Sequence, residues 1–155
     1  MQEERYGTRD RSYSAWHRRH STRRFIGIDQ AQLLAMIDLD AALYVEYDSG
    51  SKEPLALIET ARDVGQPYKS ATVTKRLAKR AGIPGYCVLY TCAEVPNPAD
   101  PHWCDIKGFR VRRLWPSPER GWRKLGPQEW ASALLKIRAW TTMRLDVEAA
   151  NDPTY

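Results

Sequence analysis

Two apolar runs in the first half of the chain, separated by turn-forming residues, predict a β-hairpin. Residues 39–47 and residues 55–60 are rich in aliphatic and aromatic side chains, which are typical of strands. The intervening segment Asp48-Ser49-Gly50-Ser51 favours a turn, because Gly50 can adopt a positive φ. If Ser49 and Gly50 form the centre of the turn, the residue numbers of each facing pair add up to 99.

This register brings acidic residues together on one face of the predicted hairpin. Asp40 lies opposite Glu59, and directly opposed side chains have Cβ atoms about 4.5–5.5 Å apart. Asp38 points to the same face as Asp40, because side chains along a strand alternate with a period of two. Taken singly, each acid could be structural, with the aspartates as caps and Glu59 paired with Arg62. Three converging carboxylates repel one another unless a cation binds them, so the set indicates a divalent metal site.

A helix and a buried strand are predicted after the hairpin. Residues 67–81 favour a helix, because a proline suits its first turn and a glycine follows its end. Its apolar residues recur at every fourth position, as Val73, Leu77 and Ala81. Residues 85–92 form a nearly continuous apolar run, which is typical of a strand buried on both faces. Strand, helix and strand in this order predict a βαβ unit.

The last third of the chain adds a strand and a helix. Residues 106–115 form a strand-like run that is rich in arginine, as an edge strand can be. A helix begins near Pro127, and its buried stripe is expected to consist of Trp130, Leu134, Ile137 and Trp140. The elements together predict an α/β fold.

The length and composition are those of one globular domain. The chain has 155 residues, of which 43% are hydrophobic, and it contains six tryptophans. We expect a single domain over residues 23–147, preceded by a basic, partly mobile segment at residues 1–22 and followed by a tail at residues 148–155. No apolar run reaches the roughly 18 residues of a membrane span, so we expect a cytoplasmic protein with no membrane partner.

The cysteines point to no disulfide framework, because there are only three of them. Cys87 lies in an apolar run and is expected in the core. Cys92, His102 and Cys104 could hold zinc, but a fourth ligand is missing.

Basic residues outnumber acidic ones and gather in three stretches. The formal net charge is +5, and the cations lie near the N-terminus, on the predicted helix, and around Trp115 and Trp122. Arginine interleaved with tryptophan suits phosphate contact and base stacking, although a run of charges could equally be a solvated face. The candidate nucleic-acid-binding residues are Arg18, Arg19, Arg23, Arg24, Lys75, Arg112 and Arg113.

The acidic hairpin also carries a family resemblance. The segments Ile37-Asp38-Leu39-Asp40 and Leu57-Ile58-Glu59-Thr60-Ala61 resemble the core of the PD-(D/E)XK nuclease superfamily. The same stretch is similar to a group of small phage-encoded proteins with a DID…EY…ALIE pattern, and the resemblance covers roughly residues 36–91. It implies a restriction-endonuclease-like mixed β-sheet core flanked by helices, in a protein that hydrolyses phosphodiester bonds in DNA.

The resemblance implies roles for individual residues as well. Asp40 matches the motif aspartate, and Glu59 matches the acid of the (D/E)XK element. Together with a main-chain carbonyl near Thr60, they would hold Mg²⁺ or Mn²⁺, while Asp38 would tune this ion or bind a second one. Cleavage of two DNA strands would favour a homodimer, and a phage-encoded nuclease would act in the cytoplasm of the host cell.

One position departs from the family's pattern. The family places a lysine two residues after the glutamate, where this chain has Ala61. That lysine helps to position the attacking water and to stabilise charge on the phosphate. Lys69 is the best-placed substitute, and Gln66 could also face the site from the start of the predicted helix. The alternative is a catalytically inactive nuclease-fold protein that binds nucleic acid or inhibits a host protein.

Overall fold

The chain folds as two units. The computed structural model describes residues 12–37 and 39–151, without the side chains of residues 14 and 147–151. Contacts between residues separate Met1–Asp38 from Leu39–Tyr155. The division therefore falls after residue 38, whereas the sequence analysis expected the domain to begin after residue 22.

The first unit consists of short helices, α1 (Ser12–Trp16), α2 (Arg19–Ile26) and α3 (Ile28–Ala31). Gly27 separates α2 from α3 with a φ of +81°, a conformation that favours glycine. Only Thr22 and Ala31 are buried among the described residues of this unit. Since Thr22 lies inside α2, this helix crosses the boundary that the sequence analysis placed at residue 22.

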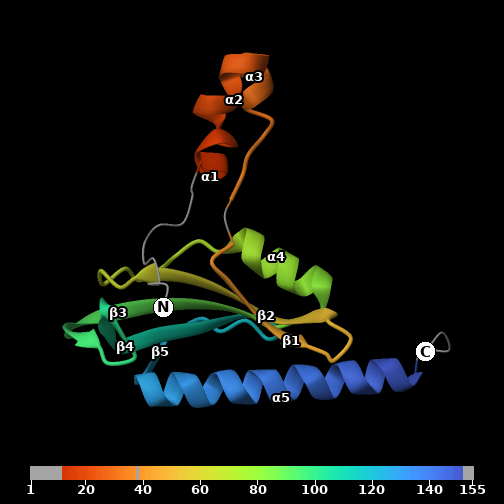
Figure 1. Cartoon of the computed structure of the whole chain (residues 1–155), viewed down its shortest axis with the longest axis vertical. Coiled ribbons are helices and arrows are strands. Elements are labelled where there is room, and N and C mark those ends of the chain that lie inside the picture. Colours follow the sequence, from red (N-terminus) through yellow and green to blue (C-terminus); the bar gives the residue numbers. More distant parts are fainter. Residues whose placement is uncertain (1–11, 38, 152–155) are drawn as a thin grey trace, which may run out of the picture. The chain divides into compact units, whose positions relative to one another are not determined.

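The second unit is a five-stranded mixed sheet with a helix on each face (Figure 1). The strands run across the sheet in sequence order. They are β1 (Ala41–Glu46), β2 (Lys52–Arg62), β3 (Gly85–Asn97), β4 (Asp100–Trp115) and β5 (Arg123–Leu125). β2 and β3 are parallel, and the other neighbouring pairs are antiparallel. The predicted α/β fold, with a mixed sheet flanked by helices, is confirmed.

Two helices of the second unit cover opposite faces of this sheet (Figure 1). α4 (Thr72–Ala81) connects β2 to the parallel β3, which confirms the predicted βαβ unit. α5 (Pro127–Asn151) follows β5 and lies along the other face. It continues without a break past residue 148, where the tail was expected to begin.

The register of the β1–β2 hairpin results from two irregularities that offset each other. Its loop has three residues, because the backbone N–H of Tyr47 donates to the carbonyl of Ser51, and Gly50 has a φ of +85°. The predicted two-residue turn is therefore wrong. A β-bulge at Leu55 then shifts the pairing back by one residue. Beyond the bulge Ala41 pairs with Ile58, which is the register predicted for this end of the hairpin.

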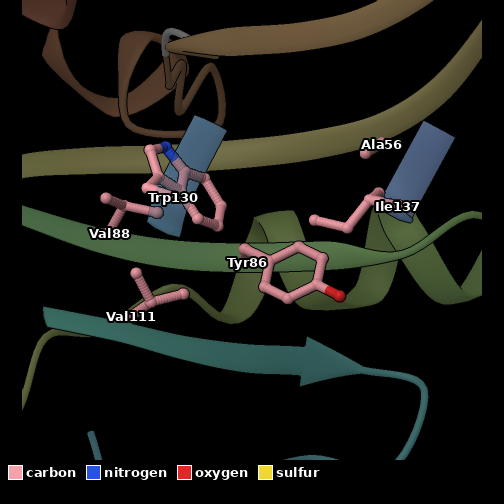
Figure 2. Packing of buried hydrophobic residues seen from close by; sticks show 6 residues of the cluster. All are labelled: Ala56, Tyr86, Val88, Val111, Trp130 and Ile137. Carbon is pink, nitrogen blue, oxygen red and sulfur yellow. The ribbon is translucent and has the colours of Figure 1, made fainter. Parts of the chain in front are cut away.

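The larger hydrophobic core lies between the sheet and α5. Side chains of β2, β3 and β4 meet two residues of α5, Trp130 and Ile137 (Figure 2). The cluster consists of Ala56, Tyr86, Val88, Val111, Trp130 and Ile137. The predicted stripe of α5 is thus correct for these two residues. It is wrong for Trp140, which is 41% exposed and carries the guanidinium of Arg144 over its ring.

The opposite face of the sheet packs against α4 through small side chains. Ala78 is fully buried, together with Thr74, and Ala78 lies close to Gly85 of β3. The predicted apolar stripe of Val73, Leu77 and Ala81 is instead exposed. The hydrophobic repeat identified the helix but not the side that faces the sheet.

The ends of several elements differ from the prediction. α4 begins at Thr72 instead of residue 67, because the carbonyl of Pro67 accepts a hydrogen bond from the Trp122 ring nitrogen. β3 and β4 extend further than expected and pair beyond Cys92, where bulges interrupt the pairing. β5 was not predicted. No helix within the described ranges is long and apolar enough to cross a membrane.

Candidate active site

Glu59 is the centre of a polar site on the α4 face of the sheet. It lies in β2 and is only 8% exposed. The hydroxyl of Thr74, on α4, donates to Glu59 Oε2 over 3.0 Å. The Nζ of Lys69 lies 3.6 Å from Glu59 Oε1. A buried carboxylate is therefore held by a neutral donor on one oxygen and a cation on the other.

Asp40 reaches the same site from the other strand of the hairpin. It stands one residue before β1, next to the pair formed by Ala41 and Ile58. Its Oδ2 accepts a hydrogen bond of 2.8 Å from the backbone N–H of Thr60, the residue that follows Glu59. Asp40 is exposed, and its Oδ1 has no hydrogen-bond partner among the described residues. Asp38, the third predicted acid, lies outside the described residues.

A row of paired residues runs across the sheet through this site. Glu59 pairs with Cys87 in the parallel register, and Cys87 pairs with Arg112 on β4. The thiol of Cys87 is buried, as expected, and burial raises its pKa. The charges of Lys69 and Arg112 act on this pKa in the opposite direction, and those of Glu59 and Asp40 raise it further. All four charged groups therefore lie close enough to the thiol to affect its pKa.

Lys69 reaches Glu59 from an irregular segment, since residues 67–71 precede α4. Tertiary hydrogen bonds fix this segment. The Trp122 ring nitrogen donates to the carbonyl of Pro67 over 2.9 Å, and Arg110 donates to the carbonyl of Gln66 over 2.9 Å. The side chain of Gln66 bonds to the main chain of residues 62 and 64. Gln66 is therefore committed to its own loop, and of these two residues only Lys69 contacts Glu59.

An ion pair anchors the loop that leads from β2 to Lys69. Arg110 donates to both carboxylate oxygens of Asp63 over 2.7 Å. This hydrogen bonding, followed by a bond from the backbone N–H of Gly65, lowers the pKa of Asp63 from 3.8 to about 2. Both side chains are largely buried. The sequence gives no local signal for this role of Asp63, because its partner Arg110 lies 47 residues away.

A cleft lined by cationic residues lies between α4 and β4, beside the Glu59 site, and we refer to it as the α4–β4 cleft. It encloses about 420 Å³. Its cationic and aromatic lining consists of Tyr68, Lys75, Arg76, Lys79, Arg112 and Arg113. Three residues predicted to bind nucleic acid, Lys75, Arg112 and Arg113, therefore come together here.

The other predicted nucleic-acid-binding residues belong to the first unit. Arg18, Arg19, Arg23 and Arg24 are all exposed there. The first three line a cavity of about 550 Å³ within that unit, and Arg24 stacks on the ring of Phe25. The predicted basic residues thus form two groups, one in each unit.

The donor atoms of the site are the kind that hard divalent cations prefer. Asp40 and Glu59 offer carboxylate oxygens, and Thr60 adds a main-chain carbonyl. Within residues 12–37 and 39–151 no three His, Cys, Asp or Glu side chains form a group that could hold a metal. Cys92, His102 and Cys104, the candidate zinc ligands, therefore do not form such a group either. A cation at this site would therefore have at most two carboxylate ligands among the described residues.

Comparison with known proteins gives no relative. No family model matches the chain, and no curated protein or solved structure gives a significant match.

Proposed function

We propose that the protein is a metal-dependent nuclease that hydrolyses phosphodiester bonds in DNA, of the PD-(D/E)XK type. The observation that carries this proposal is the surroundings of Glu59. A buried carboxylate contacts Lys69 on one side, and Asp40 bonds to the adjacent main chain on the other. Two acids and one lysine are the charged groups that such a reaction requires.

Asp40, Glu59 and the main-chain carbonyl of Thr60 are the proposed ligands of Mg²⁺ or Mn²⁺, with Asp38 as an additional acid. These ions take oxygen ligands, and Mg²⁺ is often bound by only one or two carboxylates, with water and substrate phosphate completing its shell. Oδ1 of Asp40, which has no hydrogen-bond partner among the described residues, and the carboxylate oxygens of Glu59 fit this requirement. A bound ion would activate water and offset the charge that develops on the phosphate.

Lys69 supplies the cation that the family's pattern places at position 61. Its Nζ contacts Glu59 without substrate, and a phosphate that binds at the site offers it a second anionic partner. The attacking water gives up one proton to solvent as its oxygen forms the new bond to phosphorus, and the bond to one bridging oxygen breaks. The leaving oxygen takes up a proton from solvent, which yields a phosphate monoester and a hydroxyl. Cleavage of both strands would use a homodimer, acting in the cytoplasm of a phage host.

One observation favours a second candidate function. Position 61 is an alanine, and the contact between Lys69 and Glu59 can be understood as a permanent internal ion pair. The chain would then be a catalytically inactive nuclease-fold protein that binds nucleic acid or inhibits a host protein. The two candidates differ in whether Glu59 is needed for bond cleavage.

Incubation of supercoiled plasmid with the full chain and Mg²⁺ or Mn²⁺ tests the proposal. We expect nicking that EDTA abolishes. Glu59→Gln and Asp40→Asn are expected to reduce the rate at least about a hundredfold, and Lys69→Met by a similar factor. The matched control is Glu94→Gln, which changes an exposed glutamate of β3 and should cleave like wild type.

Two results would contradict the nuclease proposal. Plasmid binding without any metal-dependent nicking by the wild type would support the inactive alternative. Nicking that persists in Glu59→Gln at the wild-type rate would show that the activity belongs elsewhere.

A further inference from the structure

The α4–β4 cleft has positive charge on both walls. Lys75, Arg76 and Lys79 line it from α4, and Arg112 and Arg113 line it from β4. The one acid in its lining is Glu119, which already accepts hydrogen bonds from the backbone N–H of Arg113 and from the Arg123 guanidinium. Five cations in one cleft repel one another, and an anionic ligand relieves this repulsion.

Arg112 is held in the cleft by aromatic rings. Its guanidinium lies 5.3 Å from the ring centre of Tyr68 and 5.2 Å from that of Trp122. The guanidinium makes no hydrogen bond to any described residue, and its buried Nε has no partner among them. A guanidinium presents five N–H donors in a fixed geometry that suits phosphate. Arg112 is therefore oriented and still able to bind an anion.

Tyr68 adds an aromatic surface at the same place. It lines the cleft and is 62% exposed, although one of its neighbours is the Arg112 guanidinium. Trp122 continues the series of contacts, because it also lies 5.3 Å from the guanidinium of Arg110, which Asp63 holds. Tyr68 is thus the accessible end of an ordered stack of rings and guanidinium groups. A nucleic-acid base can stack on such a ring only when it is not stacked within a duplex.

Residues of the cleft are adjacent in the chain to residues of the Glu59 site. Tyr68 precedes Lys69, and Thr74, which donates to Glu59, precedes Lys75 in the cleft wall. Arg112 pairs with Cys87, which pairs with Glu59. A nucleic-acid strand that lies in the cleft would therefore pass next to Glu59.

We propose that the α4–β4 cleft binds a single strand of nucleic acid, with Arg112 on a phosphate and Tyr68 against a base. The inference deepens the proposed nuclease function by naming an unpaired strand, such as a locally melted stretch of supercoiled plasmid, as the form of DNA that reaches Glu59, and it rests on that function only as far as cleavage is concerned. Binding itself needs neither the metal nor Glu59.

Fluorescence anisotropy with the full chain in EDTA measures this binding. The probes are a labelled oligothymidylate of about 20 nucleotides and a labelled hairpin duplex of the same total length. We expect the single strand to bind at least about tenfold more tightly. Tyr68→Ala should weaken single-strand binding about tenfold, because base stacking on an aromatic ring contributes about 1–3 kcal/mol, and should leave duplex binding unchanged.

Two paired variants test the charged walls of the cleft. Lys75→Gln combined with Lys79→Gln removes two cations from α4, and should lower the slope of log affinity against log salt by about 1.4. The matched control combines Arg80→Gln with Arg138→Gln, two exposed arginines outside the cleft lining. This control removes the same net charge and should retain most of the affinity and the slope.

The outcomes separate this inference from the nuclease proposal. Equal loss of affinity in the cleft variant and in the control would show that the strand does not bind in the α4–β4 cleft. Equal affinity for the two probes would contradict the preference for a single strand. If binding depends on the cleft but no metal-dependent cleavage occurs, only the nuclease proposal fails.

Discussion

Glu59 shows how one buried acid is stabilised by residues that are distant in the sequence. Its partners come from α4 and from the segment before α4, and its strand neighbour is the buried Cys87. A carboxylate with so little exposure is costly to bury unless it is paired and hydrogen-bonded. Because Thr74 offsets part of this cost with its hydrogen bond, it stabilises the fold as well as holding Glu59 in place.

Replacement of Thr74 by valine should therefore destabilise the protein. The variant keeps the shape of the side chain but leaves Glu59 Oε2 without its donor, and a hydrogen bond to a charged group contributes about 1.5–3 kcal/mol. We expect the free energy of unfolding in urea to fall by this amount, and Thr74→Ser to lose less. Thr72→Val is the control, because Thr72 is exposed at the start of the same helix. Equal effects at both positions would show that Thr74 does not support Glu59.

At the scale of elements, the contact between α4 and β3 depends on the absence of a side chain. A Cβ at Gly85 would lie 2.9 Å from the Cβ of Ala78, which is closer than such atoms approach each other. The helix can therefore lie near the sheet only while one partner is a glycine. This closeness brings Thr74 within reach of Glu59.

Gly85→Ala is expected to push α4 away from the sheet. Overpacking of this kind costs about 1–3 kcal/mol, and we expect a corresponding loss in the free energy of unfolding by urea. Gly121→Ala is the matched control, because a Cβ there meets no atom within 4 Å. Its stability should stay within about 0.5 kcal/mol of wild type. If Gly85→Ala had the same free energy of unfolding as wild type, α4 would be shown to move without cost.

The same helix illustrates what the sequence could and could not predict. The repeat of Val73 and Leu77 correctly indicated a helix, yet both side chains are exposed. The buried side carries Thr74 and Ala78, whose small size matters only because Gly85 lies opposite. A hydrophobic pattern measures the apolar character of one element and contains no information about the size of its partner.

The site was predictable to the extent that it depends on local pairing. Strand alternation placed Asp40 and Glu59 on one face, and the structure has the predicted register there only because the bulge offsets a loop that is one residue longer than predicted. The position of Lys69 was less accessible to sequence reasoning, since it depends on hydrogen bonds from Trp122 and Arg110, which are 55 and 44 residues from their acceptors. Long-range contacts of this kind leave no periodic signal.

At the scale of the whole molecule, the packed core belongs almost entirely to one unit. Ala31 is the only buried hydrophobic residue of the first unit within the described part of the chain. The second unit contains the sheet, both covering helices and the ion pair between Asp63 and Arg110, which joins the end of β2 to β4. Global unfolding should therefore report on the second unit.

The pH dependence of unfolding should reveal this ion pair. The pKa of Asp63 is lowered from 3.8 to about 2 in the folded chain, mainly by hydrogen bonds from Arg110. The stabilisation is therefore complete above pH 3.8 and is lost as the pH falls toward 2. We expect wild type to exceed Asp63→Asn in free energy of unfolding by a constant amount above pH 5, and the difference to shrink below pH 4. Urea unfolding followed by tryptophan fluorescence measures it, and a difference independent of pH would exclude the ion pair as its source.

The three-residue loop and the bulge at Leu55 together make the chain sensitive to changes in length between Asp40 and Glu59. Regular pairing of Leu55, with the loop unchanged, would slide one strand past the other by a single step. Such a slip turns a strand's side chains to the opposite face, and Glu59 would then stand across from an aliphatic residue. A deletion in this stretch should therefore preserve the register where it removes an unpaired residue, in the loop or at Leu55, and shift it where it removes a paired one.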